Sequence, residues 1–133
     1  MKKIVIYIFV LAVSWLFYVF VMGFDIDVGL IKNNKEISIT FYNDNNSSEI
    51  ERLLTNDEKD ELIRWLQSND SDWTDSLVSY VPDIVLRGEN FSLNFLPDLA
   101  VLNYKSESME KYVQVTRTLK NDENILSFLG QNE

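Results

Sequence analysis

The feature that most constrains this chain is an unbroken apolar run, IVIYIFVLAVSWLFYVFVMGF, which begins at Ile4 and ends at Phe24. These 21 residues contain no Asp, Glu, Lys or Arg, and as a helix they would extend about 31 Å, close to the hydrocarbon thickness of a bilayer. Two lysines precede the run and Asp25 and Asp27 follow it, and basic residues favour the cytoplasmic side of a membrane. We therefore expect a signal-anchor transmembrane helix over residues 1–24, with the N-terminus in the cytoplasm and the rest of the chain on the periplasmic or extracellular side of the cytoplasmic membrane.

The alternative to an anchor is a cleaved signal peptide. Ala12 with Ser14, or Val21 with Gly23, could meet the small-residue requirement before a cleavage point. However, the apolar core of a signal peptide is typically about 7 to 15 residues long, and this run is longer. Cleavage after Ser14 would also leave a wholly apolar stretch at the new N-terminus of a soluble protein. The run therefore favours an uncleaved anchor and leaves cleavage open.

The rest of the chain is strongly acidic. Beyond Phe24 there are 109 residues, the usual size of one domain. Two of the 12 basic residues, Lys2 and Lys3, precede the apolar run, so ten remain with all 21 acidic residues, a formal charge of −11. Nucleic acids and anionic lipid surfaces are bound through clustered Lys and Arg, so we expect neither as a partner. A basic protein surface, such as that of a toxin or an envelope protein, would be attracted.

The chain contains neither cysteine nor histidine. Disulfides, thiolate metal sites and thiol nucleophiles are therefore absent, and most zinc and copper sites lack their usual ligands. Serine-histidine and cysteine-histidine catalytic arrangements are excluded for the same reason. An enzyme would depend on carboxylates or lysine, and no serine lies on a glycine-flanked turn with a basic partner. We expect a protein that is not an enzyme and has no cofactor.

The residues after the apolar run divide into a stalk, expected over 25–36, and an exported acidic domain over 37–133. Apolar residues alternate from Ile37 to Phe41, which is typical of a strand with one buried face. Thr55 and Glu58 have the spacing of a capping box and predict the start of a helix that runs to about Gln67. Its buried stripe would consist of Leu62, Ile63 and Leu66, with Trp65 at the border.

Two predicted turns specify a three-stranded antiparallel meander over residues 83–104. A turn at Gly88-Glu89 would place Leu86 opposite Phe91, and a turn at Pro97-Asp98 would continue the sheet. Both turns put apolar side chains on the same face, which a one-residue slip at either turn would disrupt. That face would hold Ile84, Leu86, Phe91, Leu93, Phe95, Ala100, Leu102 and Tyr104.

Two further elements complete the expected fold. Residues from Tyr112 to Thr116 have the pattern of a further strand, and residues 121–129 that of a short closing helix with Ile125, Leu126 and Leu129 buried. The fold class is therefore predicted to be α+β. After the transmembrane helix we expect a meandering antiparallel sheet of about four strands, packed with one longer helix and one short C-terminal helix.

The candidate binding residues fall into two groups. Asp70, Asp72 and Asp75 surround Trp73 in a loop after the predicted helix, and closely spaced carboxylates can hold calcium. The segment lacks the glycine and the spacing of an EF-hand loop, so we predict no metal site there. Trp73 would either fold back onto the core or form an exposed aromatic anchor for a partner.

The second group is polar and lies on the other face of the meander. Ser92, Asn94 and Asn103 share that face, with Gln114 and Thr116 as further candidates. These side chains could recognise a partner through hydrogen bonds, or they could be the solvated side that antiparallel sheets commonly keep. The sequence leaves both interpretations open.

The hypothesis that best fits this layout is a membrane-tethered inhibitor, such as an immunity protein against an envelope-acting toxin. A short basic start, one spanning helix and an α+β domain of this size resemble the plan of colicin M immunity proteins, although no motif is shared. The alternative is a bitopic accessory or regulatory subunit of an envelope complex or membrane sensor. A third hypothesis is a sensor that holds a small apolar ligand between sheet and helix.

Overall fold

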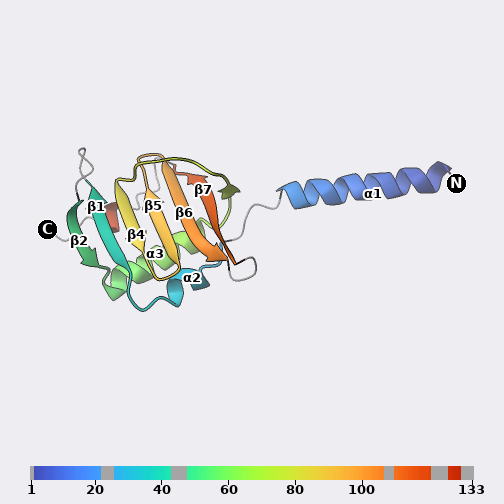
Figure 1. Ribbon diagram of the computed structural model, residues 1–133. Coiled ribbons are helices and arrows are strands. Elements are labelled where there is room, and N and C mark those ends of the chain that lie inside the picture. The colour runs from blue at the N-terminus through green and yellow to red at the C-terminus, as the bar shows by residue number, and fades with distance from the viewer. Residues whose placement is uncertain (1, 22–25, 43–47, 107–109, 121–125, 130–133) are drawn as a thin grey trace.

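The computed structural model describes residues 2–21, 26–42, 48–106, 110–120 and 126–129. The described part is an α+β structure with one seven-stranded antiparallel sheet, in the order β2-β1-β4-β5-β6-β7-β3 (Figure 1). The helices are α1 (Lys2–Val21), α2 (Gly29–Lys32), α3 (Asn56–Ser68) and α4 (Leu126–Leu129). The strands are β1 (Ser38–Tyr42), β2 (Ser48–Leu53), β3 (Thr74–Asp75), β4 (Ile84–Arg87), β5 (Phe91–Phe95), β6 (Leu99–Ser106) and β7 (Lys111–Thr118).

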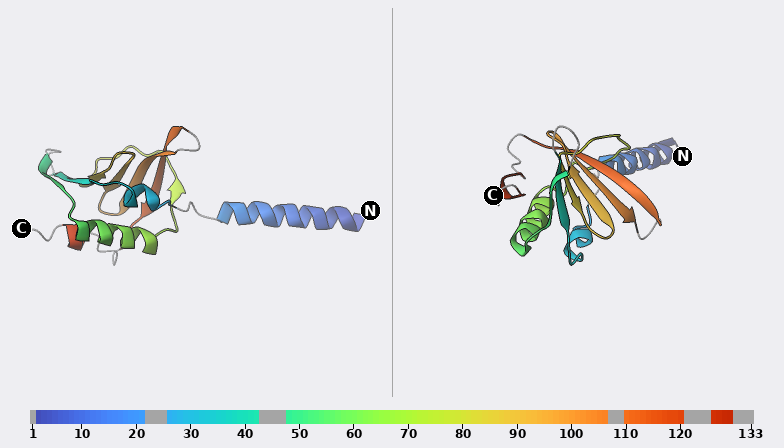
Figure 2. Two further views of the ribbon diagram at one scale, coloured as in Figure 1. Left: turned by 90° about the horizontal axis from the view of Figure 1, so that it is seen from below. Right: turned by 60° about the vertical axis from the view of Figure 1, so that its left-hand side comes forward.

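One face of the sheet packs against α3 and forms the core (Figure 2). The capping box predicted at Thr55 and Glu58 is present, and α3 runs to Ser68, one residue beyond the predicted end. Leu62 and Leu66 are fully buried, whereas Ile63 is half-buried. Trp65 stands edge-on to Phe95 of the sheet, with ring centroids 5.6 Å apart. The apolar face predicted for the meander contributes to this core Ile84, Leu86, Phe91, Leu93, Phe95, Ala100 and Leu102, with Tyr104 at its margin.

The second predicted turn is confirmed, whereas the first lies one residue later than predicted and changes the strand register by two residues. Across the turn at Pro97 and Asp98, Phe95 pairs with Ala100. Across the first turn, however, Leu86 pairs with Leu93 and not with Phe91. The chain reverses at Glu89 and Asn90, with the Gly88 amide donating to the Phe91 carbonyl at 3.1 Å. Side chains in a strand alternate with a period of two, so the two-residue error left the buried face unchanged.

The number of strands is also larger than expected, seven against about four. The strand at the start of the domain and the one around Tyr112 are present as β1 and β7. Two strands were not predicted from the sequence. One is β2, whose residues SEIERL pair with β1 across an irregularity between Phe41 and Tyr42. The other is β3, a two-residue strand that pairs with β7. Both are edge strands, so pairing with one neighbour holds them in place and their own residues carry little apolar signal.

The segment expected to be a stalk packs onto the domain over its described residues, 26–36. Ile31 of the short helix α2 is fully buried, and Ile26 and Val28 contact the same core. At the other end of the chain, Leu129 of α4 is buried and α4 lies against α3. Residues 121–125 of the predicted closing helix lie outside the described residues.

The N-terminal helix α1 projects away from the sheet (Figure 1). Among the residues that the structure describes, no helix meets the length and hydropathy expected of a membrane span.

Candidate functional site

The face of the sheet opposite α3 is partly covered by the chain itself. After β3, residues 76–83 run along this side before entering β4 (Figure 1). The Val78 amide donates to the side-chain oxygen of Gln114 at 2.7 Å, and the Asn103 amide group donates to the Tyr80 hydroxyl at 2.7 Å. Gln114 in turn donates to Asn103 at 2.9 Å. The polar residues of β6 and β7 therefore hold this segment in place.

Four large apolar side chains remain exposed beside this network, and we call them the docking surface: Leu77, Val78, Val81 and Tyr112. Leu77 is 91% exposed, Tyr112 is 78% exposed and Val81 is 59% exposed. Tyr112 lies on the same side of β7 as Gln114, because residues two apart in a strand share a face. The bond from Val78 to Gln114 places the segment next to that side. Leu77 and Val78 are consecutive, and exposed apolar patches are typical of protein interaction sites.

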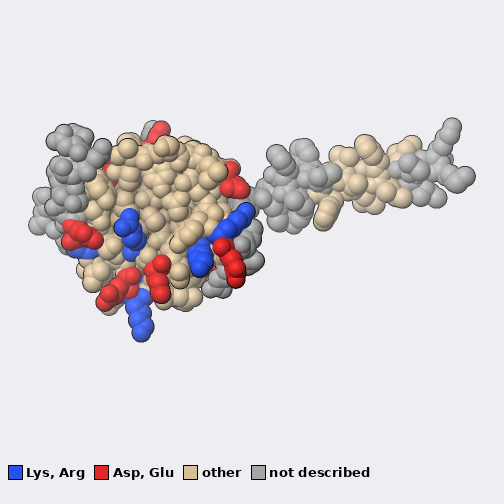
Figure 3. Space-filling model, in the orientation of Figure 1, with Lys and Arg blue, Asp and Glu red and all other residues tan. Residues whose placement is uncertain are grey.

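Figure 3 views the side of the sheet that is opposite α3 and shows a broad area without charged side chains. Lys, Arg, Asp and Glu lie mainly along its margins. A surface with an uncharged middle and a charged rim has the composition expected of a non-obligate protein interface.

The three predicted acidic residues lie in β3 and in the loop before it. Asp70, Asp72 and Asp75 are all exposed. Asp72 adopts a left-handed backbone conformation, with φ of 66°, which aspartate tolerates better than most residues. Asp75 pairs with Val115 of β7, so its side chain shares the core face of the sheet with Val115 and lies at the exposed edge of that face. No group of three or more potential metal-binding residues occurs within the described part of the chain.

Trp73 lies in the core and is 1% exposed. Its indole N–H donates to the Asn69 carbonyl at 2.7 Å, and its ring stands edge-on to that of Trp65, with centroids 6.5 Å apart. Of the two interpretations of Trp73, the structure therefore favours the one in which it caps the core. So placed, Trp73 offers no surface to a partner.

The three predicted polar residues of the meander are less accessible than a solvated face would be. Asn94 is 4% exposed and donates to the Val101 carbonyl at 3.2 Å. Ser92 is half-buried and its hydroxyl lies 3.1 Å from the Asn94 side-chain oxygen. Asn103 is half-buried and bonded to Tyr80. Their hydrogen-bonding capacity is largely used within the protein, so they support the docking surface more than they form it.

The exposed residues of the docking surface were therefore not predicted from the sequence. Two signals could have found them. Leu77 and Val78 stand in a segment without strand alternation, where no partner was predicted to cover them. Tyr112 occupies a position of β7 that alternates with the buried Val113 and Val115, which assigns it to the outer side.

A separate cleft of about 540 Å³ lies at the end of the sheet where β6 ends and β7 begins. It is lined by residues of α2, the turn after β4 and the end of β6, among them Asp27, Glu89, Asn90, Tyr104 and Lys105. Burial raises the pKa of the Tyr104 hydroxyl, and the negative charge of Asp75 acts in the same direction. Tyr104 therefore stays neutral at physiological pH.

Comparison of this chain with protein-family models, with curated proteins and with solved structures finds no match.

Proposed function

We propose that this protein is a membrane-anchored, non-enzymatic protein-binding domain on the non-cytoplasmic side of the membrane, and that it acts as an inhibitor of the immunity type. The docking surface is the observation that carries this proposal. It presents apolar side chains to solvent on a domain whose core is otherwise well covered, and monomeric soluble proteins rarely leave such residues together without a use.

The anchor in this proposal is α1 with the flanking apolar residues. The side chains described for α1, residues 6–15, are exposed and all but Ser14 are apolar; they include Ile6, Tyr7, Ile8, Phe9, Leu11 and Trp15. Water is an unfavourable surrounding for such a helix, and a hydrocarbon layer is a favourable one. Lys2 and Lys3 at its start support a cytoplasmic N-terminus, which leaves the domain outside.

The partner in this proposal is a basic protein. The residues beyond Phe24 carry a formal charge of −11, and Asp70, Asp72 and Asp75 are exposed in β3 and the loop before it. Such a field accelerates encounter with a positively charged surface, and the apolar residues then supply desolvation and contact. Tethering to the membrane raises the effective concentration of the inhibitor at the place where an envelope-acting toxin would arrive.

The inhibitor is preferred over an accessory subunit because α1 offers no face for specific helix pairing. Ala12 and Ser14 are the small residues between Ile4 and Val21, and they are not four apart as close helix packing in a membrane requires. An accessory subunit would normally contact its complex through the membrane as well as outside it.

The test is co-purification from detergent-solubilised membranes with tagged full-length protein, comparing Leu77→Ser/Tyr112→Ser with Leu53→Ser. Leu53 is 54% exposed but lies on β2, at the far edge of the sheet, and is the matched control. We expect one basic protein to co-purify with the wild type and the Leu53 variant, to be lost with the double variant, and to be weakened by added salt. Recovery of the same resident membrane proteins by all three forms would contradict the inhibitor and favour the accessory subunit.

A further inference from the structure

The chain gives the domain little freedom to move away from α1. Helix α1 ends at Val21, and Ile26 already packs against the core of the domain. Five residues of chain reach at most about 17 Å when fully extended. If α1 crosses the bilayer, as the proposed function requires, the side of the domain around Ile26 and Asp27 is therefore held close to the membrane surface.

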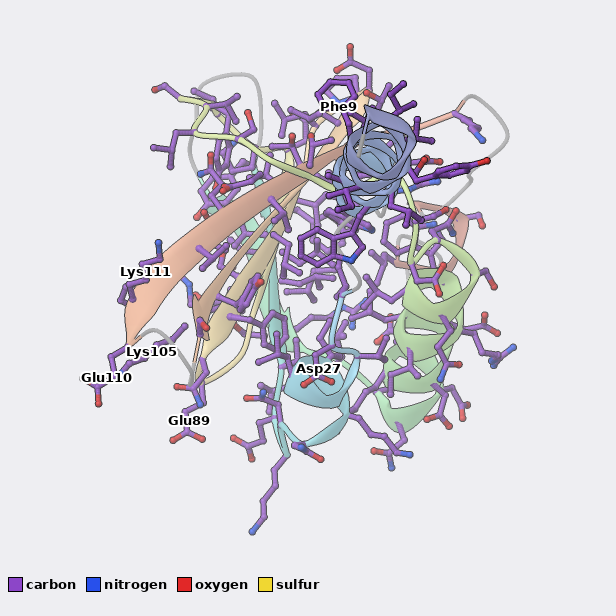
Figure 4. The ribbon with its side chains drawn as sticks, turned by 90° about the vertical axis from the view of Figure 1, so that its right-hand side faces the viewer. Phe9, Asp27, Glu89, Lys105, Glu110 and Lys111 are labelled. Atoms are coloured by element: carbon purple, nitrogen blue, oxygen red, sulfur yellow. The ribbon has the colours of Figure 1, made fainter. Side chains whose placement is uncertain are left out.

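That side of the domain carries the cleft. Figure 4 views the domain along α1, and Asp27, Glu89, Lys105, Glu110 and Lys111 appear below and to the left of α1. Asp27, Glu89 and Lys105 line the cleft of about 540 Å³, and Lys105 with Glu110 lines an adjoining hollow of about 340 Å³. Asp27 lies six residues after the end of α1, so with α1 as the membrane anchor this part of the cleft is close to the lipid headgroups.

The walls of the cleft are fixed by hydrogen bonds between the elements that form it. The Glu89 amide donates to the Asn34 side-chain oxygen at 2.7 Å, which joins the turn after β4 to the residues after α2. The Lys105 amide donates to the Asn90 carbonyl at 3.0 Å, which joins the end of β6 to the same turn. The Lys59 ammonium group donates to the Asn34 carbonyl from α3. A cleft of this kind does not need to be assembled when a ligand arrives.

The charges around the cleft are of both signs and are not paired with one another. Within the described residues, Arg52 pairs with Glu58 and Arg64 pairs with Glu61, and neither pair involves the cleft. Asp27 and Glu89 offer carboxylates, Lys105 offers an ammonium group, and Asn90 and Tyr104 offer neutral polar groups. These groups match a ligand that carries a phosphate and an amine a short distance apart.

We propose that this cleft binds the zwitterionic headgroup of a phospholipid, with its phosphate on Lys105 and its ammonium group between Asp27 and Glu89. This proposal rests on the proposed membrane anchor, because the anchor is what brings the cleft to the lipid that would be its ligand. An anionic lipid is a poorer fit, because the carboxylates would repel its second charge and the whole domain is acidic. The headgroup would hold the domain in one orientation at the membrane and so direct the docking surface.

The experiment is a titration of the full-length protein in neutral maltoside micelles, followed by the backbone amide shifts of Glu89, Asn90 and Lys105. The probes are glycerophosphoethanolamine, inorganic phosphate and ethanolamine, and the variants are Lys105→Glu and Lys120→Glu. Lys120 is an exposed lysine beside the turn between β5 and β6, at the other end of the strands. We expect saturable shifts with glycerophosphoethanolamine, about tenfold weaker binding in Lys105→Glu, and unchanged binding in Lys120→Glu.

Absence of saturable shifts would overturn the proposal, as would equal weakening by both variants. Inorganic phosphate binding as tightly as glycerophosphoethanolamine would show an anion site without headgroup recognition, and would also overturn it. Nanodiscs containing phosphatidylethanolamine should shift the same amides, and discs of phosphatidylglycerol should not. Alkaline carbonate extraction of membranes tests the proposed anchor separately, because an anchored protein stays in the membrane pellet. Binding of glycerophosphoethanolamine needs no bilayer, so a wrong cleft proposal can be distinguished from a wrong anchor proposal.

Discussion

Replacing Glu58 with Gln is expected to destabilise the domain by about 2 to 3 kcal/mol, because one carboxylate serves both an ion pair and a helix cap. The Arg52 guanidinium donates to both carboxylate oxygens of Glu58, at 2.6 and 2.8 Å. The Thr55 amide donates to Glu58 Oε2 at 2.8 Å, and the Glu58 amide donates to the Thr55 hydroxyl at 3.2 Å. These contacts join the edge strand β2 to the first turn of α3.

The magnitude follows from what glutamine retains. Glutamine offers one acceptor oxygen, so one charge-assisted hydrogen bond of about 1.5 to 3 kcal/mol is lost and the Arg52 charge loses its counterion. Glu58 is only 5% exposed, but the Arg52 side chain is 27% exposed and water offsets part of that loss. Truncating a fully buried pair costs about 3 to 5 kcal/mol, and the expected value lies below that range.

The same pair determines a pH dependence. The hydrogen bond from Arg52 is the main cause that holds the pKa of Glu58 below its ordinary value of 4.5, with the bonds to Thr55 acting in the same direction. A carboxylate with a lowered pKa in the folded state contributes stability that is present above the unfolded pKa and is lost as the pH falls through the folded pKa. The difference in unfolding free energy between wild type and Glu58→Gln should therefore shrink on acidification below about pH 4.5.

The assay is urea unfolding of the full-length protein in neutral detergent, followed by tryptophan fluorescence at several pH values. The matched control is Glu61→Gln, which removes an exposed pair with Arg64 of the same helix, at 2.8 Å. That pair should contribute less than about 0.5 kcal/mol. Equal destabilisation by the two substitutions, or a Glu58 effect that grows as the pH falls, would refute the reasoning.

Two further pairs of substitutions test the core. Gly88→Ala should lower the free energy of unfolding by about 1 to 3 kcal/mol, because the added Cβ would lie 2.3 Å from the ring of buried Phe91. In Gly29→Ala the added Cβ meets an exposed side chain, so the free energy of unfolding should fall by less than about 0.5 kcal/mol. Urea unfolding followed by circular dichroism would measure both, and equal costs would contradict the contact. In the same assay, Trp73→Phe should lower the free energy of unfolding by about 1 kcal/mol more than Trp65→Phe. The reason is that the Trp73 indole donates a hydrogen bond at 2.7 Å, whereas the buried Trp65 nitrogen has no partner. The reverse order would contradict this assignment.

Local chemistry made parts of the fold predictable. The capping box at Thr55 needs only four consecutive residues to form, and α3 begins where it predicts. The turn at Pro97 likewise depends on the preset φ of proline and gave the correct register. Gly88 was predicted as the first residue of a two-residue turn, a position that favours the positive φ of glycine. However, no described glycine has a positive φ. The glycine is needed instead for space against Phe91, which a sequence cannot show.

The missing elements depend on contacts distant in the sequence. Helix α2 has four residues and no side-chain cap at Val28, so its position follows from the burial of Ile31 against the core. The candidate site was missed for a similar reason. Whether Leu77 and Tyr112 are covered is decided by where residues 76–83 cross the sheet, and that path is set by hydrogen bonds to residues of β6 and β7.

The docking surface is tested most directly by photo-crosslinking in intact cells, with a photoreactive amino acid at position 77 of the full-length protein. Position 53 serves as the control, since Leu53 is also exposed but lies at the opposite edge of the sheet. The account predicts one crosslinked product with a basic protein outside the cytoplasm from position 77, and none from position 53. Crosslinks to cytoplasmic proteins, or the same products from both positions, would contradict it.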